Sequence, residues 1–304
     1  MSTMFYAGVD GGGTKTAIVV VDDTGNEVAR ATTTTSNSAV IGHANAAGVL
    51  CDLVEKTCGT AGIAMPLAGL WCGLSGSDRP EDQAQLQPRL EHLTRDLRLT
   101  NDAELAMGAL PGEVGIVLVS GTGSIAFGRN PEGKRHRASG WGHIFGDYGS
   151  GYDIARKALY QYSAYIDGYG PWTSLVDRFT ELYELTDPYS IINRIYDVKT
   201  TKGDIARLSR VVVAEANHGD AVSIQIINDV ADDLAVYADA VARKLSLGLA
   251  LNLAMVGGML THVPMFEQRV LARLKENWEI GAVQHVTDPA LTGARAIASK
   301  ESKV

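Results

Sequence analysis

The stretch Val9-Asp10-Gly11-Gly12-Gly13-Thr14-Lys15-Thr16 lies between the segments Met4–Ala7 and Ala17–Val21. An acid at the end of a first strand, three glycines and two hydroxyl side chains, followed by a second strand, predict a hairpin whose turn can surround a phosphate. Glycines permit positive φ and have no Cβ, so successive N–H groups can converge on an anion. Phosphoryl chemistry is therefore the leading hypothesis for this turn.

Two familiar phosphate motifs do not fit this stretch. A P-loop needs four residues between its first glycine and a Gly-Lys pair, but Gly13 is followed by Thr14. A dinucleotide fingerprint opens a helix, whereas the β-branched residues in Ala17–Val21 predict a strand. An ordinary glycine-rich hairpin is the alternative. Because Asp10 would repel a bare phosphate, its position suggests a divalent cation between the two charges.

A second copy of the pattern occurs about 110 residues later, in Ser120-Gly121-Thr122-Gly123-Ser124. An apolar strand again runs into a turn of Gly, Thr and Ser and out into another strand. Two such copies suggest two homologous half-folds facing each other across a cleft, with a chance repeat as the alternative. Two phosphate-binding turns would suit one polyphosphate.

Composition is typical of a globular enzyme with two sizeable cores. The chain has 304 residues, of which 45% are hydrophobic and 20% charged. A net charge of −8 without a basic stripe argues against a nucleic-acid partner. The sequence has no apolar span long enough for a membrane helix and no signal core at its start, so we expect no membrane partner and a cytoplasmic location. Cys51, Cys58 and Cys72 form no C-x-x-C pair, and we expect free thiols and no structural zinc.

The order of the predicted elements indicates an α/β fold in two lobes, each a mixed sheet flanked by helices. The first lobe is expected to span residues 1–113, where Leu110–Glu113 interrupts the pattern, and the second 114–290. Strands are expected at 4–9, 16–21, 27–32, 67–73, 115–120, 124–128 and 253–256. Helices are expected near 42–58, 80–95, 102–109, 149–166, 173–184, 188–196, 203–217, 220–246, 264–276 and 290–299.

These residues resemble the acetate and sugar kinase, actin and heat-shock ATPase superfamily. Within it, the chain is similar to the N-acetylglucosamine and glucosamine kinases of the BadF/BadG/BcrA/BcrD-type ATPase branch. The resemblance implies two ribonuclease H-like lobes with the ligand cleft between them, helix 291–301 packed on the first lobe, and a homodimer formed through the second. The segments that carry it are Asp10–Thr16, Asn101-Asp102, Ser120–Ser124, Ser139–Gly151 and Val256–Leu260.

The resemblance also implies an activity. The chain would transfer the γ-phosphate of ATP, bound with Mg²⁺, to the 6-hydroxyl of N-acetylglucosamine. Glucosamine or N-acetylmuramic acid is the alternative acceptor. A different class, the ATPase activators of acyl-CoA dehydratases and reductases, would need thiolates for an iron–sulfur cluster at a subunit interface. A catalytically silent sugar sensor would be expected to lack the base, yet Asp102 is present.

Asp102 is the expected general base, since the matching acid in these kinases accepts the proton of the sugar hydroxyl. Composition alone would favour an N-cap for Asp102, a core residue for Trp141 and a polar loop residue for Asn37. The resemblance implies sugar contacts from Asn37, Asn101, Asp102, Gly123, Ser124, Gly140, Trp141, Gly142 and Asp147. It implies ATP contacts from Gly11, Gly12, Gly13, Thr14, Lys15, Thr16, Gly121, Thr122, Ala216, Gly257, Gly258 and Met259, with Asp10 holding Mg²⁺ through water.

Overall fold

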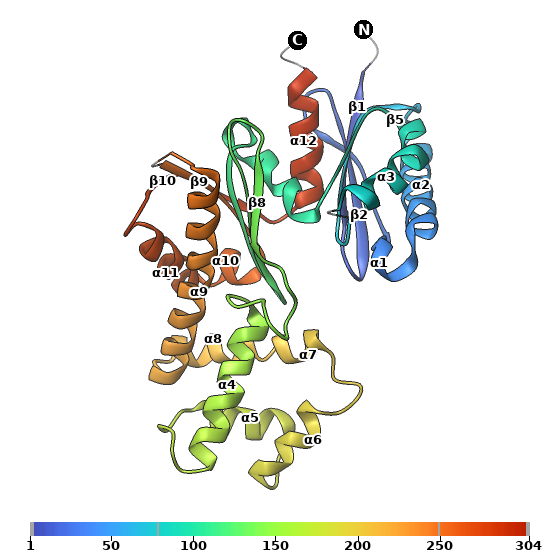
Figure 1. Ribbon diagram of the computed structural model, residues 1–304. Helices are drawn as coiled ribbons and strands as arrows, with labels where there is room; N and C mark the ends of the chain where they lie inside the picture. The colour runs from blue at the N-terminus through green and yellow to red at the C-terminus, as the bar shows by residue number, and fades with distance from the viewer. Residues whose placement is uncertain (1–2, 78, 249, 302–304) are drawn as a thin grey trace. The chain divides into compact units, whose positions relative to one another are not determined.

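A computed structural model describes residues 3–77, 79–248 and 250–301 and separates into two compact units (Figure 1). Unit 1 comprises the residues up to Val114 together with those from Val286 onward, and unit 2 comprises Gly115–His285. Each unit is built on a five-stranded mixed sheet with helices packed against it. The expected α/β fold of two ribonuclease H-like lobes is confirmed.

The sheet of unit 1 has the strand order β3-β2-β1-β4-β5, with β1 antiparallel to β2 and parallel to β4. Its strands are β1 (Phe5–Gly11), β2 (Lys15–Asp22), β3 (Glu27–Thr34), β4 (Leu67–Leu74) and β5 (Thr94–Thr100). Its helices are α1 (Ser38–Ile41), α2 (His43–Thr60), α3 (Pro80–Leu90) and α12 (Pro289–Glu301), with the 3-10 turns η1 (Glu91–Leu93), η2 (Asp102–Ala109) and η3 (Pro111–Glu113).

Alternate residues of β1 enter two different cores, as the two-residue period of a strand requires. Tyr6 packs with α12 on one face of the sheet, whereas Ala7 and Val9 pack with α2 and α3 on the other. Figure 1 shows α12, in red, beside β1. A Cβ on Gly8 would lie 2.0 Å from the carbonyl oxygen of Ala290. Glycine at this position is therefore what allows α12 to approach the strand so closely.

The sheet of unit 2 has the strand order β10-β9-β6-β7-β8, with β6 antiparallel to β7 and parallel to β9. Its strands are β6 (Gly115–Ser120), β7 (Ser124–Arg129), β8 (Arg135–Ser139), β9 (Ala250–Val256) and β10 (Glu279–Val286). Its helices are α4 (Gly151–Ile166), α5 (Leu175–Tyr183), η4 (Pro188–Ser190), α6 (Ile191–Ile195), α7 (Lys202–Ala206), α8 (Ser209–Asn217), α9 (Ala221–Leu245), α10 (Gly258–His262) and α11 (Pro264–Leu274).

Helix α9 forms much of the core of unit 2. Val230, Leu234 and Val241 are fully buried, at the spacing that places residues on one face of a helix. The helix packs against β6, β7 and β8, and its N-cap is Asp220, whose Oδ1 accepts the Ser223 N–H at 2.7 Å. Within residues 3–77, 79–248 and 250–301, no helix is both long and apolar enough to span a membrane.

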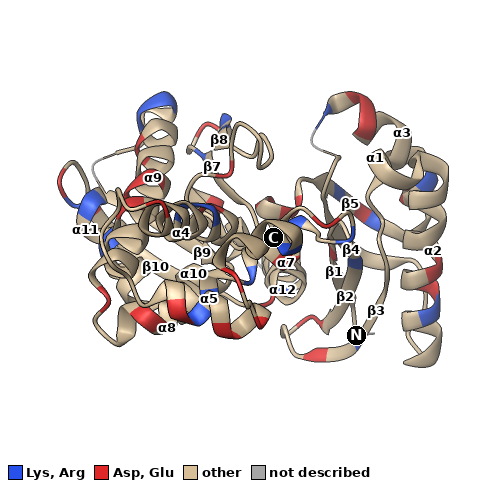
Figure 2. Cartoon of the chain, turned by 90° about the horizontal axis from the view of Figure 1, so that it is seen from below, with Lys and Arg blue, Asp and Glu red and all other residues tan. Residues whose placement is uncertain are grey.

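Three strands, β5, β8 and β10, are absent from the sequence-based expectation, and all three lie at the edges of their sheets. Charged residues interrupt β5 and β8, as Figure 2 shows, and β10 begins with Glu279; charge is a common means of protecting an exposed edge. The helix expected over 80–95 was therefore wrong beyond Leu90, where η1 and β5 follow. The single helix expected over 203–217 is divided into α7 and α8.

Candidate functional site

The first glycine turn joins β1 to β2 in unit 1. Gly11 pairs with Thr16 across the hairpin, and Gly12 donates its N–H to the Lys15 carbonyl oxygen at 2.9 Å. A Cβ on Gly11 would lie 2.5 Å from Ser36 Oγ, so a larger residue would displace its neighbours. The buried Thr16 hydroxyl donates to the same Ser36 Oγ at 2.9 Å. The turn thus has the expected hairpin form, but the Thr16 hydroxyl is engaged by the protein itself.

Asp10 lies half-buried near the end of β1, beside the exposed residues Thr14 and Lys15 of the turn. Burial, followed by the charges of Asp102 and Asp288, raises the pKa of the Asp10 carboxyl from 3.8 to about 6, against a lowering by Lys15. Ionising Asp10 is therefore unfavourable in the protein alone. A cation bound nearby would relieve this repulsion.

Replacing Asp10 by Asn is expected to change how stability depends on pH. A carboxyl whose pKa is higher in the folded chain contributes stability below its unfolded pKa and loses it as the pH rises through the folded value, here from about 4 to about 6. A shift of about two units corresponds to about 3 kcal/mol. In urea unfolding without metal or nucleotide, we expect D10N to exceed the wild type by up to about 3 kcal/mol at pH 8 and by little at pH 4.

Asp23 provides the matched control, because it lies exposed in the turn after β2. D23N makes the same chemical change at the surface and should keep the wild-type dependence on pH. Parallel stability profiles for D10N and the wild type between pH 4 and pH 8 would contradict the assignment to Asp10.

Asn101 and Asp102 form the corner between β5 and η2. Asn101 is the N-cap of η2, with its Oδ1 accepting the Ala103 N–H at 3.0 Å, and Asp102 Oδ1 accepts the same N–H at 2.9 Å. A Cβ on Gly73 of β4 would lie 3.1 Å from the Asp102 Cα, so the corner packs closely on the sheet. The N-cap is therefore Asn101. The charge of Asp102 contributes to the raised pKa of Asp10.

Asn37 caps another short helix of unit 1. Its Oδ1 accepts the Ala39 N–H at 3.0 Å, at the start of α1. A Cβ on Gly76 would lie 2.5 Å from the same oxygen, so the loop after β4 passes directly beside Asn37. Because Oδ1 is used by the helix, the Nδ2 amide of Asn37 is the group best suited to a ligand.

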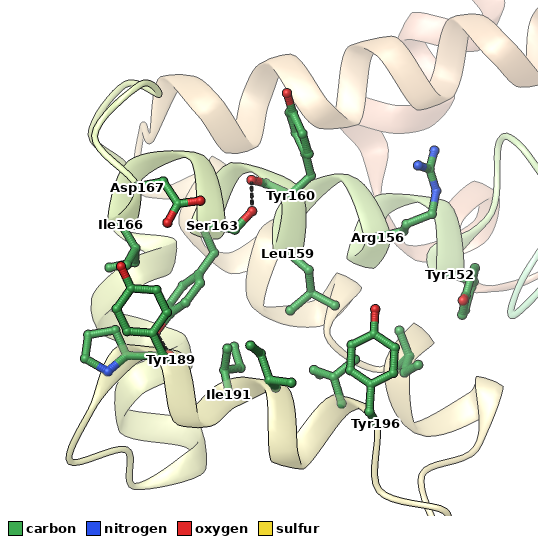
Figure 3. Close-up of a pocket in the computed structure, with 15 residues that line it drawn as sticks. Tyr152, Arg156, Leu159, Tyr160, Ser163, Ile166, Asp167, Tyr189, Ile191 and Tyr196 are labelled. Carbon is green, nitrogen blue, oxygen red and sulfur yellow. Dashed lines mark hydrogen bonds between the residues drawn. The ribbon is translucent and has the colours of Figure 1, made fainter.

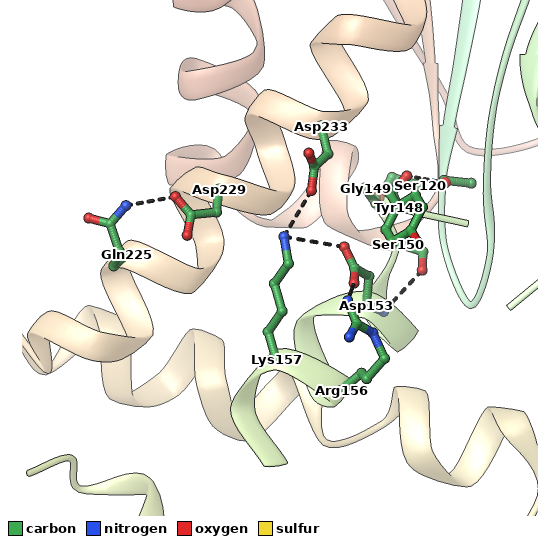
Figure 4. A network of polar contacts seen from close by, with 11 residues as sticks. Ser120, Tyr148, Gly149, Ser150, Asp153, Arg156, Lys157, Gln225, Asp229 and Asp233 are labelled. Atoms are coloured by element: carbon green, nitrogen blue, oxygen red, sulfur yellow. Dashed lines mark hydrogen bonds and ion pairs between the residues drawn. The ribbon is translucent and has the colours of Figure 1, made fainter. Parts of the chain in front are cut away.

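The second glycine turn joins β6 to β7 in unit 2. Gly121 donates its N–H to the Gly123 carbonyl oxygen at 3.0 Å, and the Gly151 N–H donates to the Gly121 carbonyl oxygen at 2.8 Å. The Ser120 hydroxyl donates to the Gly149 carbonyl oxygen at 2.6 Å, a contact visible in Figure 4. The first of these bonds closes the turn, and the other two hold it against the start of α4 and the residues just before it.

Ion pairs anchor the same end of α4 to α9. The Lys157 Nζ lies 2.8 Å from Asp233 of α9 and 3.6 Å from Asp153, whose side chain is almost fully buried (Figure 4). Arg156 adds a hydrogen bond of 2.8 Å to Asp153. The second glycine turn is therefore supported by a polar network that reaches the central helix of unit 2.

Gly257 lies at the corner between β9 and α10, which packs against the second glycine turn. Its φ is +93°, a conformation that L side chains rarely adopt. A Cβ there would lie 2.4 Å from the Ser120 carbonyl oxygen and 3.1 Å from the Gly121 nitrogen. Close contact between the two corners therefore requires glycine.

A cavity of about 540 Å³ in unit 2 lies beside these corners. Gly121 and Thr122 line it together with Gly258 and Met259, four of the residues expected to contact ATP. Ala216, also expected there, is instead buried in the core within α8. The structure thus brings together residues from two distant parts of the sequence.

The same cavity is lined by Arg207, Ser209, Arg210 and His262, which sequence reasoning missed. The usable signal was the pair of arginines itself, with Arg207 just after α7 and Arg210 in the first turn of α8. Arginine is also the residue best suited to phosphate recognition.

Several of the residues expected to bind the sugar meet around Asp147. This buried residue has a φ of +57°; its Oδ1 accepts the Ser124 N–H at 3.4 Å, and its Oδ2 accepts the Lys202 ammonium at 2.6 Å. The Ser124 hydroxyl donates to the Tyr148 carbonyl oxygen at 2.5 Å, and Gly140 donates its N–H to the Ser124 carbonyl oxygen at 3.2 Å. The loop after β8 is thereby fastened to the second glycine turn.

Trp141 is a surface residue, with 62% of its area exposed. The Arg137 guanidinium lies 5.6 Å from the centroid of its ring, and the Phe145 ring lies 6.2 Å away. Positive φ values at Gly140 and Gly142 set the path of the chain on either side. A core role for Trp141 is excluded, and its indole is available to a ligand.

A second cavity in unit 2, of about 650 Å³, lies between α4 and α6 (Figure 3). It is lined mainly by tyrosines and aliphatic residues, among them Leu159, Tyr160, Ile191 and Tyr196. None of the residues expected to contact sugar or ATP lines it. Apolar cavities of this kind suit apolar contacts better than phosphate.

Comparison with known proteins extends over almost the whole chain. An N-acetylmuramic acid/N-acetylglucosamine kinase of Clostridium acetobutylicum is 32% identical, covering 98% of this chain and 99% of the relative. An N-acetyl-D-glucosamine kinase of Dictyostelium discoideum is 31% identical, covering 100% of both. A crystal structure from Chromobacterium violaceum, provisionally assigned as an N-acetylglucosamine kinase, shares the fold with a TM-score of 0.70 and 23% identity over 97% of this chain and 98% of that one.

The model of one protein family covers both units. It describes the BadF/BadG/BcrA/BcrD ATPases and matches residues 7–295, from within β1 to α12. Both glycine turns and the β9–α10 corner fall inside the match. Because the family model and the relatives align along nearly the full length, the chain belongs to the BadF/BadG/BcrA/BcrD ATPase family.

Proposed function

We propose that this ATP-dependent sugar kinase transfers the γ-phosphate of ATP to the 6-hydroxyl of N-acetylglucosamine. The observation that carries the proposal is the cavity of about 540 Å³ bordered by the second glycine turn, Gly258 and Arg210. Its volume is within the range of about 300–1,000 Å³ found for small-ligand sites. N-Acetylglucosamine is favoured because both relatives aligned over their full length are described as kinases for it. Glucosamine and N-acetylmuramic acid are the alternative acceptors.

ATP would be held by the glycine turns and the β9–α10 corner. We assign phosphate contacts to the exposed part of Gly11–Thr16 and to Gly121 and Thr122, and nucleoside contacts to Gly257–Met259. Backbone N–H groups in such turns form concave sites for anions. The burial of Ala216 argues against a direct contact, and Ser209 and Arg210 of the same helix, which line the cavity, replace it in the proposal.

Asp102 would accept the proton of the sugar 6-hydroxyl. With Asn101 as the N-cap, the Asp102 carboxylate is not required to start η2. A carboxylate is an adequate base when the transition state is loose and proton transfer occurs late, because positioning and charge stabilisation then supply most of the catalysis. Asn101 itself would contribute a hydrogen bond to the sugar.

The remaining sugar contacts are assigned to three segments. Asn37 in unit 1 offers its amide. In unit 2 the contacts come from Gly123 and Ser124 of the second glycine turn and from Gly140–Gly142 and Asp147 of the loop after β8. A carboxylate and amides suit sugar hydroxyls, while an exposed indole suits the apolar face of a hexose. The measured contacts of Asp147 and the exposure of Trp141 support this assignment.

Magnesium accompanies ATP in such kinases and neutralises charge on its phosphates. We propose that Asp10 holds the ion through water. Mg²⁺ is commonly bound by one or two carboxylates together with phosphate oxygens and waters, so a single acid beside a phosphate turn fits it. Burial, followed by the charges of Asp102 and Asp288, raises the pKa of Asp10, and a cation at this position would offset that cost of ionising it.

We also propose a homodimer formed through the helices of unit 2, in the cytoplasm. Tyr160, Tyr189, Ile192 and Tyr196 are exposed around the cavity of Figure 3, in and next to α4 and α6. Exposed apolar patches of this kind mark protein interfaces. No structural observation bears on the cellular location, which stays a prediction.

No observation favours the alternative class of ATPase activators. Cys58 and Cys72 are fully buried, and burial raises their pKa values to about 11 and about 12. Cys51 is half-buried, and its pKa is raised as well. Ligation of an iron–sulfur cluster between subunits needs accessible thiolates, which these cysteines do not readily provide.

A substrate screen tests the proposed function. Purified protein with Mg²⁺ and ATP should phosphorylate N-acetylglucosamine more efficiently than glucosamine, N-acetylmuramic acid or glucose. The 6-deoxy analogue of N-acetylglucosamine should not be phosphorylated, because it lacks the accepting hydroxyl. A coupled assay that monitors the production of ADP measures each rate. If none of these sugars is phosphorylated, the kinase assignment is wrong. If the 6-deoxy analogue is phosphorylated, the 6-hydroxyl is not the acceptor.

A further inference from the structure

Lys202, the first residue of α7, contacts Asp147 across 55 residues of sequence. Its Nζ donates to Asp147 Oδ2 at 2.6 Å, a short hydrogen bond between two charged groups. The other carboxylate oxygen accepts the Ser124 N–H at 3.4 Å, a much weaker interaction. The side chain of Lys202 is 29% exposed, whereas that of Asp147 is 6% exposed. Lys202 is therefore the main group that holds this carboxylate.

Asp147 needs such a partner for two reasons. Its φ of +57° is unusual for a residue with a side chain, so its backbone conformation is maintained by its surroundings. Its carboxylate is nearly buried, and a buried charge without a partner is strongly unfavourable. Removing the ammonium would leave one long hydrogen bond to fix the orientation of Asp147.

Helix α7 does not require a lysine at this position. The helix starts with a capping box in which Thr201 and Asp204 bond to each other's backbone. A positive charge in the first turn is unfavourable next to the exposed N–H groups of a helix. The contact with Asp147 explains Lys202 better than the stability of α7 does.

The pair adjoins the part of the second glycine turn that is assigned to the sugar. A Cβ on Gly123 would lie 3.0 Å from Asp147 Oδ2 and 3.2 Å from Lys202 Nζ. The ammonium also lies 6.0 Å from the centroid of the Tyr152 ring. A lysine next to such a turn could act on the sugar through Asp147, or it could bind a phosphate directly. The hydrogen bond of 2.6 Å to Asp147 favours an effect on the sugar.

We propose that Lys202 is a positioning residue of the sugar site, which holds the Asp147 carboxylate in place to accept hydrogen bonds from sugar hydroxyls. The assignment rests on the proposed function, which gives Asp147 its role. A carboxylate has about four acceptor positions, so a sugar hydroxyl can bind Asp147 while Lys202 stays in contact. Lys202 would thus raise sugar affinity without touching the reacting atoms.

Replacing Lys202 by Met tests the assignment. The KM for N-acetylglucosamine should rise about 10- to 100-fold, the effect of losing one hydrogen bond to a charged group. The kcat and the KM for ATP should stay within about twofold of the wild type, because the lost interaction serves substrate binding. K202R, which keeps the cation, should recover most of the sugar affinity. Steady-state kinetics measure all three constants.

Lys199 supplies the matched control. It lies exposed three residues before Lys202, so K199M removes the same charge from the same loop and should behave like the wild type. Circular dichroism and ATP binding show whether each variant is folded. K202Q, which keeps a polar side chain, gives the same comparison should K202M fail to fold.

A double-mutant cycle distinguishes action through Asp147 from direct contact with phosphate. In the D147N background, K202M should raise the sugar KM by less than about twofold, because the effects of substitutions at residues that act as a unit are not additive. An unchanged sugar KM in K202M, or a full additional effect in D147N, would overturn the assignment. So would a rise in the KM for ATP or a fall in kcat in both backgrounds, which would place Lys202 at a phosphate. If the wild type phosphorylates none of the amino sugars, the proposed function fails and this assignment fails with it.

Discussion

Replacing Asp102 by Asn should lower the rate of N-acetylglucosamine phosphorylation by about 10²- to 10⁴-fold, the usual contribution of a general base. Asparagine has nearly the same shape and keeps an oxygen that can accept the Ala103 N–H, which Asp102 accepts at 2.9 Å. An amide cannot take the proton of the sugar hydroxyl. We therefore expect a folded protein that still binds ATP, measured by calorimetry, but transfers phosphate very slowly.

Asp96 provides a matched control for this change. It is exposed on β5, the strand that leads to Asp102, and D96N should keep the wild-type rate. Retained activity in D102N would remove Asp102 as the base. Loss of ATP binding together with activity would instead show that the Asp102 charge serves the fold or the nucleotide.

Replacing Gly257 by Ala should lower both stability and ATP affinity. The added Cβ would lie 2.4 Å from the Ser120 carbonyl oxygen, and the φ of +93° is strained for alanine. Overpacking and backbone strain each cost about 1–3 kcal/mol, so we expect a loss of about 2–6 kcal/mol in the free energy of unfolding. Because the clash is with the residue that begins the second glycine turn, the turn must shift, and ATP should bind more weakly. Urea unfolding and calorimetric titration measure the two effects.

Gly258 is the neighbouring control. A Cβ there meets no atom within 4 Å, and the residue opens α10, where alanine is more favourable than glycine. G258A should therefore be at least as stable as the wild type. Equal losses of stability in both variants, or no loss of stability in G257A, would contradict the close packing of the β9–α10 corner against the second turn.

The two glycine turns and the strands beside them could be predicted because their signals are local. Apolar strands that end in glycines and hydroxyl residues specify hairpins through backbone conformation alone, and β1, β2, β6 and β7 follow that pattern. The buried helix α9 was predictable for the same reason, since its apolar residues repeat at helical spacing. Fold class follows from the order of such elements.

Edge strands and short helices were not predictable in this way. β5, β8 and β10 carry charged or polar residues, and they form strands because a neighbouring strand supplies hydrogen bonds and one face to cover. The helical pattern over 80–95 continues into Thr94, yet pairing of β5 with β4 ends the helix at Leu90. Tertiary contacts overrode local preference in both cases.

The fold class, the two phosphate-type turns and the acids at strand ends follow from local sequence, because backbone preference and apolar spacing act over a few residues. The surroundings of these features depend on how the elements pack in the folded chain. It placed Arg207, Arg210 and His262 around the cavity beside Gly121, buried Ala216, and joined Lys202 to Asp147. Such contacts depend on how whole elements pack, since residues 55 positions apart share no local signal.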